Sequence, residues 1–247
     1  MKLCFFEEVD STNEYLKREY PKLEDMTLVY TNHQTSGKGR LGRSWSDYSE
    51  SLLLSILIKE EIAPDKIELL PLLCGVCLHL SLYDFGIRNT IKWPNDILIG
   101  DKKCAGILLE SIYKEKLEAL IIGIGINVNN SSFPDELKNK ACSLKMILNH
   151  DINKKKLLQV FIHHFETLYE SFRKNDYSFL EILRSNSYLD GREVYLNYYG
   201  ENRHCRVLGI NDDGSLKVRD ENDKTYDMKS GEVTLEKNYR CISQPKL

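Results

Sequence analysis

The sequence lacks the features that mark secreted, membrane-spanning and repetitive proteins. After Met1 and Lys2, only residues 3–6 precede Glu7 and Glu8, and this run is too short for the apolar core of a signal peptide. No apolar run approaches the roughly 20 residues that cross a bilayer. Internal repeats, low-complexity tracts and long linkers are also missing. We therefore expect no membrane contact, and a chain that folds as one large domain and one small domain.

The sequence also lacks an excess of charge and the spacing of a metal site. Its 34 Lys and Arg residues oppose 37 Asp and Glu residues, so the net charge is −3. No general field attracts nucleic acid, and any anion must be bound locally. The six histidines show no zinc-ligand spacing, which argues against a metal held by the protein alone. Seven cysteines without a regular framework indicate a reducing, cytoplasmic location.

The most informative motif is Lys-Trp-Pro-Asn-Asp at residues 92–96, followed by Asp-Lys-Lys-Cys-Ala-Gly at 101–106. The apolar residues 97–99 separate the two clusters, and Gly100 with Asp101 supplies a turn. The clusters are therefore expected at the two ends of a short hairpin. Asn95 and Asp96 are poor strand formers inside a strand pattern, which favours a binding role over a role in packing.

A second cluster, Gly-Lys-Gly-Arg-Leu-Gly-Arg, occupies residues 37–43. Its glycines and cations predict a mobile loop whose backbone N–H groups and side chains surround an anion. The glycine spacing also fits the dinucleotide-binding fingerprint. That fingerprint needs a helix after the last glycine, whereas residues 43–47 lead through a polar stretch into a strand. A plain solvated surface loop is the remaining alternative.

The periodicity of apolar residues predicts a mixed α+β fold of layered sheet and helices. Strands are expected at residues 3–6, 28–30, 51–58, 90–110 and 119–128. Helices are expected at 12–20, 65–85, 154–174 and 176–188, with Pro71 kinking or starting the second of them. Residues 130–150 are expected to form a loop and a short helix. From Gly191 onward the pattern changes to short strands at 194–196, 205–210, 216–219, 225–228 and 233–235.

Taken together, these clusters resemble the biotin protein ligase family. The loop, the Lys-Trp-Pro-Asn-Asp motif and a Lys-x-Ala-Gly segment at 103–106 occur in the family order, as do residues 10–13 and 123–129. The resemblance covers essentially the whole chain. It implies a catalytic domain at 1–189, similar to class II aminoacyl-tRNA synthetases, and an SH3-like β-barrel at 190–247. It also implies the monofunctional form, because no helix-turn-helix segment precedes residue 10.

The resemblance further implies a two-step reaction. Biotin and ATP give biotinyl-5′-AMP and pyrophosphate, and a lysine of a biotin carboxyl carrier domain then displaces AMP. Lys103 and Arg40 would be catalytic, and Mg²⁺ would arrive with ATP and lie near Asp96. The implied biotin-binding residues are Ser11, Thr12, Asn13, Gln34, Lys38, Gly39, Arg40, Lys103 and Gly106. The implied ATP- and adenylate-binding residues are Arg40, Arg43, Trp45, Lys92, Asn95, Asp96 and Asn127.

Two positions depart from the family loop, and other functions compete with the main interpretation. Lys38 and Leu41 stand where the family commonly has Arg, so the contribution of Lys38 is left open. A lipoate or octanoyl ligase of the same fold is the alternative within the same class. A non-catalytic biotin sensor or a nucleic-acid regulator is the alternative from another class. The pattern sets neither the oligomeric state nor the carboxylase that accepts biotin.

Overall fold

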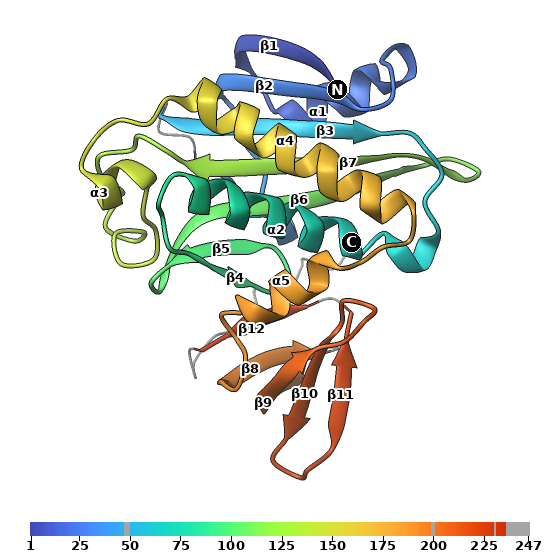
Figure 1. The fold of residues 1–247 in the computed structure, drawn as a ribbon, viewed down its shortest axis with the longest axis vertical. Coiled ribbons are helices and arrows are strands. Elements are labelled where there is room, and N and C mark those ends of the chain that lie inside the picture. The colour runs from blue at the N-terminus through green and yellow to red at the C-terminus, as the bar shows by residue number, and fades with distance from the viewer. Residues whose placement is uncertain (47–49, 199–200, 230, 236–247) are drawn as a thin grey trace.

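The computed structural model describes residues 1–46, 50–198, 201–229 and 231–235 (Figure 1). In this part of the chain, most strands belong to a seven-stranded sheet with the order β1-β2-β3-β7-β6-β5-β4. β1 and β2 are parallel, and the other neighbours are antiparallel. The strands are β1 (Lys2–Val9), β2 (Thr27–Gln34), β3 (Ser51–Ile58), β4 (Thr90–Lys92), β5 (Asp96–Ile99), β6 (Lys102–Tyr113) and β7 (Leu117–Asn127).

Helices cover both faces of this sheet. α2 (Leu69–Asp84) and α4 (Lys154–Arg173) lie over one face and enclose the main hydrophobic core (Figure 1). α1 (Thr12–Glu19) packs on the other face, where Leu16 meets Val29 and Leu57. The remaining described helical segments are α3 (Leu144–Leu148), α5 (Phe179–Ser185), η1 (Tyr20–Lys22), η2 (Arg40–Gly42) and η3 (Pro64–Lys66).

The helix expected at 65–85 begins at Leu69, which places Pro71 in its first turn, where a missing N–H is tolerated. α2 and the turn before it form a helical segment, Pro64–Asp84, of 21 residues. By length and composition this segment is apolar enough to cross a membrane. The expectation that no apolar run reaches such a length was therefore wrong. In the structure, 78% of the segment's most apolar window is buried. A core helix has the same composition as a membrane span, and burial accounts for the apolar run.

The C-terminal residues form a second, five-stranded sheet with the order β11-β10-β9-β8-β12. Its strands are β8 (Glu193–Tyr198), β9 (Glu201–Ile210), β10 (Leu216–Asp220), β11 (Thr225–Met228) and β12 (Glu232–Thr234). These match the short strands expected from the sequence within about two residues, except that β9 begins four residues earlier. Residues 236–247 of the predicted second domain lie outside the described part of the chain.

The two sheets meet at the Lys-Trp-Pro-Asn-Asp motif. Trp93 is 2% exposed, and its indole Nε1 donates a hydrogen bond to the Gly214 carbonyl at 3.0 Å. Gly214 has φ of 79°, and a Cβ there would lie 2.6 Å from Leu69 Cδ2 of α2. Only glycine therefore fits both the turn and the close approach to α2. Trp93 is a core residue, and it also joins the second sheet to the first.

Candidate functional site

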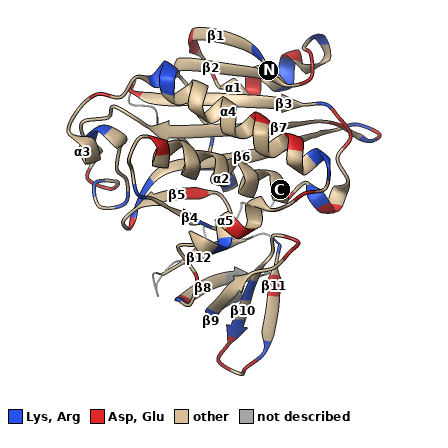
Figure 2. Ribbon diagram, in the orientation of Figure 1, with Lys and Arg blue, Asp and Glu red and all other residues tan. Residues whose placement is uncertain are grey.

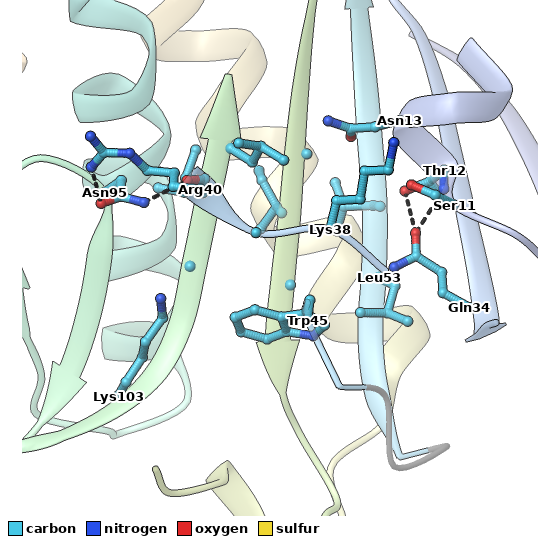
Figure 3. A pocket seen from close by; sticks show the side chains of 18 residues that line it. Ser11, Thr12, Asn13, Gln34, Lys38, Arg40, Trp45, Leu53, Asn95 and Lys103 are labelled. Carbon is cyan, nitrogen blue, oxygen red and sulfur yellow. Dashed lines mark hydrogen bonds between the residues drawn. The ribbon is translucent and has the colours of Figure 1, made fainter. Parts of the chain in front are cut away.

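A pocket lies over the middle of β6 and β7, next to the glycine-rich loop (Figure 3). Gly106 and Gly125 face each other across these strands and leave space above the sheet. The pocket is lined by Ser11, Thr12, Asn13, Gln34, Lys38, Gly39, Arg40, Trp45, Leu53, Leu54, Asn95, Lys103, Gly106, Ile107, Leu108, Gly123, Ile124 and Gly125. Polar side chains from α1 and β2 line one end, and Arg40 and Lys103 line the other (Figure 3).

The loop itself is a small hairpin. Lys38 and Ser44 form an antiparallel bridge, and the Gly39 amide donates to the Arg43 carbonyl at 2.7 Å. Leu41, at φ 56°, turns the chain at the tip and is 56% exposed. The hairpin carries Trp45 back toward the sheet, where a Cβ on Gly125 would lie 2.5 Å from its Cε2. The glycines thus make room for the indole.

Trp45 also carries an unused donor. Its Nε1 is buried and has no hydrogen-bond partner among the described residues. A buried donor without a partner is costly, by roughly 1–3 kcal/mol. Such a donor at the wall of a pocket is available to a polar ligand.

The polar end of the pocket is built on the start of α1. Ser11 is the N-cap residue, and its side chain accepts a hydrogen bond from the Glu14 amide. Thr12 donates to Gln34 Oε1 from both its amide, at 2.7 Å, and its hydroxyl, at 3.0 Å (Figure 3). The Ser55 hydroxyl of β3 lies between Thr12 Oγ1 and Asn13 Oδ1. These contacts fix the orientation of the groups that face the pocket.

Asn13 is held by two further elements. Its Nδ2 donates to Glu110 Oε2 of β6 at 2.7 Å. A Cβ on Gly123 would lie 2.3 Å from Asn13 Oδ1, so the amide rests directly on the glycine backbone of β7. Glu110 also pairs with Lys17 at 2.6 Å. Both polar side-chain atoms of Asn13 are therefore hydrogen-bonded, and the residue is 4% exposed, so Asn13 supports the pocket wall as well as lining it.

Lys38 points toward α1. Its Nζ lies 2.8 Å from Glu14 Oε1, and Lys17 reaches the same carboxylate at 2.9 Å. Hydrogen bonds from Lys38 and Lys17 hold the pKa of Glu14 below its usual range. The lysine that replaces the family arginine therefore anchors the loop to α1.

Arg40 connects three parts of the chain at the other end of the pocket. Its Nη1 donates to Asn95 Oδ1 at 2.9 Å (Figure 3), and its Nη2 to the Gly231 carbonyl at 3.3 Å. Asn95 in turn donates from Nδ2 to the Ile107 carbonyl at 2.7 Å. The loop, the β4–β5 connection and the second sheet therefore meet at one guanidinium group.

Lys103 occupies the junction between strands β5 and β6. The strand register shifts by one residue between Lys103 and Ala105, which forms a β-bulge. Bulges re-aim side chains, and here the ammonium lies over Gly106, where a Cβ would be 2.8 Å from Nζ. Lys103 Nζ is 2.6 Å from Asp96 Oδ1 and 5.5 Å from the centre of the Trp45 ring. Its side chain remains 36% exposed and can reach a ligand.

A second pocket adjoins the first and is also lined by cations. Arg40, Arg43, Lys92 and Lys103 line it together with one carboxylate, that of Asp96. Its other lining residues are Gly39, Ser44, Trp45, Trp93, Pro94, Asn95, Gly231, Val233 and Thr234. Arg40 and Lys103 line both pockets. The two cavities therefore meet at these two cations.

The two pockets bring together every predicted site residue except Asn127. Asn127 is 6% exposed, and its Nδ2 donates to the Cys142 carbonyl at 3.1 Å. Ser55, Glu14 and Glu110 were not predicted from the sequence. Ser55 had a visible signal, because it is a polar residue in the middle of an otherwise apolar strand. Glu14 and Glu110 had no such signal, since charged residues on a helix and a strand are common on surfaces.

The carboxylate of Asp96 suits a cation that arrives with a ligand. No cluster of three His, Cys, Asp or Glu side chains that could hold a metal occurs among the described residues. Asp96 Oδ1 is nevertheless buried, and apart from its ion pair with Lys103 it has no aligned hydrogen bond in the described chain. Mg²⁺ typically binds one or two carboxylates plus phosphate oxygens. Asp96 therefore fits an Mg²⁺ ion that is mostly coordinated by phosphates.

The known sequences that resemble this chain are biotin or lipoate ligases. Residues 5–127 match the sequence profile of the Biotin/lipoate A/B protein ligase family. The bifunctional ligase/repressor BirA of Bacillus subtilis is 35% identical over 201 residues, or 77% of this chain and 60% of the relative. The biotin–[acetyl-CoA-carboxylase] ligase of Paracoccus denitrificans is 33% identical over 127 residues, or 48% of this chain and 51% of the relative. The chain thus spans about half to 60% of the length of these relatives.

Solved structures agree with the sequence comparisons. Biotin protein ligase from Aquifex aeolicus, in complex with biotin and ATP, is 30% identical and superposes with a TM-score of 0.85. The match covers 94% of this chain and 97% of that chain. Biotin protein ligase from Leishmania major, in complex with biotinyl-5-AMP, is 22% identical with a TM-score of 0.63, covering 92% of this chain and 98% of that chain. This second likeness extends to the fold alone.

Proposed function

This chain belongs to the biotin/lipoate A/B protein ligase family, and from that premise we propose that it is an ATP-dependent biotin protein ligase. The observation that carries the proposal is the junction of the two pockets at Arg40 and Lys103. One pocket has neutral hydrogen-bonding groups and glycine floors, which suit the urea ring of biotin. The other has a cluster of cations, which suits the phosphates of ATP.

In the first step, an oxygen of the biotin carboxylate attacks the α-phosphorus and pyrophosphate departs. Two anions must approach each other, so cations at the junction lower the barrier by offsetting the charge. Lys103 and Arg40 lie where the carboxylate and the α-phosphate would meet. Lys92 and Arg43 extend the positive field along the phosphates, with Asn95 and Asp96 beside them. Mg²⁺, bound near Asp96, would supply further neutralisation of the phosphate charge.

In the second step, a neutral carrier lysine attacks the acyl carbon, loses a proton and displaces AMP. The mixed anhydride hydrolyses readily, so the site must exclude water between the steps. The loop hairpin with Trp45 would close over the ligand, and Lys38 would anchor it through Glu14. Ser11, Thr12, Asn13 and Gln34 would hold the urea ring, with Gly39 and Gly106 beside the ligand. Asn127 is proposed near the adenylate, where its bond to the Cys142 carbonyl would steady the segment before α3.

The proposal extends to the wider architecture and setting. We propose a class II synthetase-like catalytic domain at 1–189 and an SH3-like barrel at 190–247, based on the separate five-stranded sheet. The acceptor would be the biotin carboxyl carrier domain of a carboxylase. The cysteines of the described residues are all free, which supports a reducing, cytoplasmic setting. The near-neutral net charge gives no reason to expect nucleic-acid or membrane binding.

Incubation with ATP, Mg²⁺, labelled biotin and a carrier domain tests the proposal. Label should become covalently attached to the carrier, and pyrophosphate should be released in equal amount. Label from lipoate but none from biotin would overturn the biotin assignment in favour of a lipoate ligase. Biotin binding without pyrophosphate exchange would identify a sensor instead of an enzyme.

A further inference from the structure

Two cysteines lie side by side next to the proposed catalytic lysine. Cys104 belongs to β6, and Cys142 lies just before α3. Lys103 and Ala141 form a parallel bridge between these two segments. The Lys103 amide donates to the Lys140 carbonyl at 2.8 Å, and its carbonyl accepts from the Cys142 amide at 3.0 Å. The next pair along this short ladder is Cys104 with Cys142. Opposed residues of neighbouring strands share a face, so both thiols enter the main core together.

The two thiols interact directly, and the interaction makes one of them reactive. A hydrogen bond from Cys104 holds the pKa of the Cys142 thiol below its usual range, and the charge of Lys102 lowers it further. The same bond, together with burial, raises the pKa of Cys104. In α2, burial raises the pKa of both Cys74 and Cys77. The thiolate is the nucleophilic form of cysteine, so Cys142 is the member of the pair that reacts first.

Cys142 follows an exposed segment. The residue itself is 2% exposed, but most residues of the preceding segment, 131–140, are exposed. This described segment contains turns and no helix or strand, so a local opening breaks few contacts and admits a small oxidant. Charges of both signs are spread over the ribbon (Figure 2), whereas the chain next to the pair contributes Lys102, Lys103 and Lys140. Nearby cations favour a thiolate.

The pair is connected to two residues of the candidate site. Lys103 forms the bridge described above, and Asn127 Nδ2 donates to the Cys142 carbonyl at 3.1 Å. The Asn127 carbonyl lies 3.9 Å from Cys104 Sγ. Opposed Cβ atoms in neighbouring strands are about 4.5–5.5 Å apart, whereas a disulfide holds them at about 3.8 Å. A disulfide here would therefore draw the segment before α3 toward β6 by roughly 1 Å and would displace Lys103.

We propose that Cys104 and Cys142 are a redox-sensitive modification site, at which a reversible disulfide slows the adenylation step. The effect on the rate rests on the proposed ligase function, whereas formation of the disulfide does not. Inside cells, disulfides are usually transient and redox-sensing, which agrees with free thiols in a reducing setting.

The oxidant in this proposal is a peroxide. The Cys142 thiolate attacks one peroxide oxygen, the O–O bond breaks, and the other oxygen takes up a proton and leaves as water. The Cys104 sulfur then attacks the sulfenic sulfur of Cys142, loses its proton and displaces a second water. Two thiols and one hydrogen peroxide thus give one disulfide and two waters. A dithiol reductant reverses the reaction by thiol–disulfide exchange.

Peptide mapping of the full chain tests whether the bond forms. The reduced protein is treated with hydrogen peroxide, remaining thiols are alkylated, and the chain is digested with trypsin. The two cysteines fall on separate peptides, 104–114 and 141–145, and each peptide holds one cysteine. These peptides should be linked after oxidation and separated by dithiothreitol. The control Cys4→Ala removes a partly exposed thiol of β1 and should form the same link.

Pyrophosphate release with biotin and ATP then measures adenylation before and after oxidation. Wild type and Cys4→Ala should lose at least about tenfold in rate, because a displacement of about 1 Å at a catalytic group can cost about 10²-fold. Dithiothreitol should restore the rate. In Cys142→Ala the rate should be nearly the same before and after peroxide. The melting temperature of each reduced variant checks that it is folded.

Each part of the proposal can fail separately. Oxidised wild type without the linked peptides would overturn the modification site. Linked peptides with an unchanged adenylation rate would overturn the effect on catalysis. An equal loss of rate in folded Cys142→Ala would place the sensitive group elsewhere. Failure of the reduced wild-type chain to form biotinyl-5′-AMP would refute the ligase function, and peptide mapping alone would still decide whether the disulfide forms.

Discussion

Lys38 of the glycine-rich loop and Glu14 of α1 form an ion pair at 2.8 Å. Lys38 lines the first pocket, and the pair ties the loop to the helix whose N-terminus supplies Ser11 and Thr12. The two parallel hydrogen bonds that an arginine guanidinium can donate are unnecessary for this contact, because one ammonium reaches one carboxylate oxygen. The departure from the family pattern at Lys38 thus has a structural explanation.

Glu14→Gln should weaken biotin binding, because it removes the carboxylate that holds the loop. A partly exposed ion pair contributes about 0.2–1 kcal/mol, so the Kd for biotin should rise by a factor of about 1.4 to 5. Isothermal titration calorimetry measures the change. Glu19→Gln is the matched control, since Glu19 pairs with Lys22 at 2.9 Å on the same helix. Equal effects in both variants would show that α1 charge in general, and not the contact with Lys38, is responsible.

The same ion pair predicts a pH dependence. The pKa of Glu14 is lowered, first by the hydrogen bond from Lys38, so the folded state holds the ionised form to lower pH than the unfolded state. Its stabilisation is therefore fully present above the ordinary carboxyl range near pH 4 and is lost as the pH falls through the lowered value. The affinity difference between wild type and Glu14→Gln should be constant from about pH 8 to 6 and should shrink only in strong acid. A difference that vanishes near pH 6 would implicate another group.

Lys103→Ala should reduce the rate of adenylation by on the order of 10²–10³, because its ammonium offsets charge at the α-phosphate. A partly exposed ion pair such as Lys103–Asp96 contributes about 1 kcal/mol or less to the free energy of unfolding, so the melting temperature should change little. Transfer from preformed biotinyl-5′-AMP should suffer less, since pyrophosphate has already departed. Single-turnover kinetics separate the two steps.

Lys102→Ala is the control for Lys103. Lys102 Nζ donates to the Lys138 carbonyl at 3.1 Å, and Lys102 is absent from the lining of the two pockets at the candidate site. Its loss removes one surface hydrogen bond and should leave adenylation nearly unchanged. Similar rates for the two variants would remove Lys103 from its proposed role.

Gly125→Ala should displace Trp45, because the new Cβ would lie 2.5 Å from Trp45 Cε2. The chain contains only two tryptophans, so a Trp93→Phe background isolates the emission of Trp45. The emission should shift to longer wavelength as the indole moves into water, and the Kd for biotin should rise at least about tenfold through overpacking. Unchanged emission would mean that the indole does not rest on Gly125.

Local patterns were sufficient to predict most of the fold. The turn residues Gly100 and Asp101 mark the β5–β6 hairpin within the chain itself. The proximity of the two motif clusters is also predictable, because the β5–β6 hairpin places Asp96 opposite Gly106. Contacts that depend on strand order could not be predicted in this way. Ser55 meets Thr12 and Asn13 only because β3 lies beside β2 in the sheet.

Two site details depend on irregular geometry that no periodic pattern encodes. The bulge next to Lys103 turns its side chain over Gly106, whereas simple alternation gives only the face of the strand. The resemblance implied that Asn127 binds the nucleotide. In the structure its amide bonds to the Cys142 carbonyl, a partner set by the path of the chain between β7 and α3. That path has no repeating signal in the sequence.

The hydrogen bond from Trp93 to Gly214 bears on how a shortened chain should be interpreted. Removal of residues 190–247 would leave the buried indole N–H without its acceptor and would deprive Arg40 of the Gly231 carbonyl. The Lys-Trp-Pro-Asn-Asp segment would lose part of its support even if no C-terminal residue ever touched substrate. Loss of activity in such a truncated chain would therefore show that the second sheet supports the site structurally. Substitutions in the second sheet that keep both carbonyl contacts are needed to test whether this sheet contacts the carrier domain.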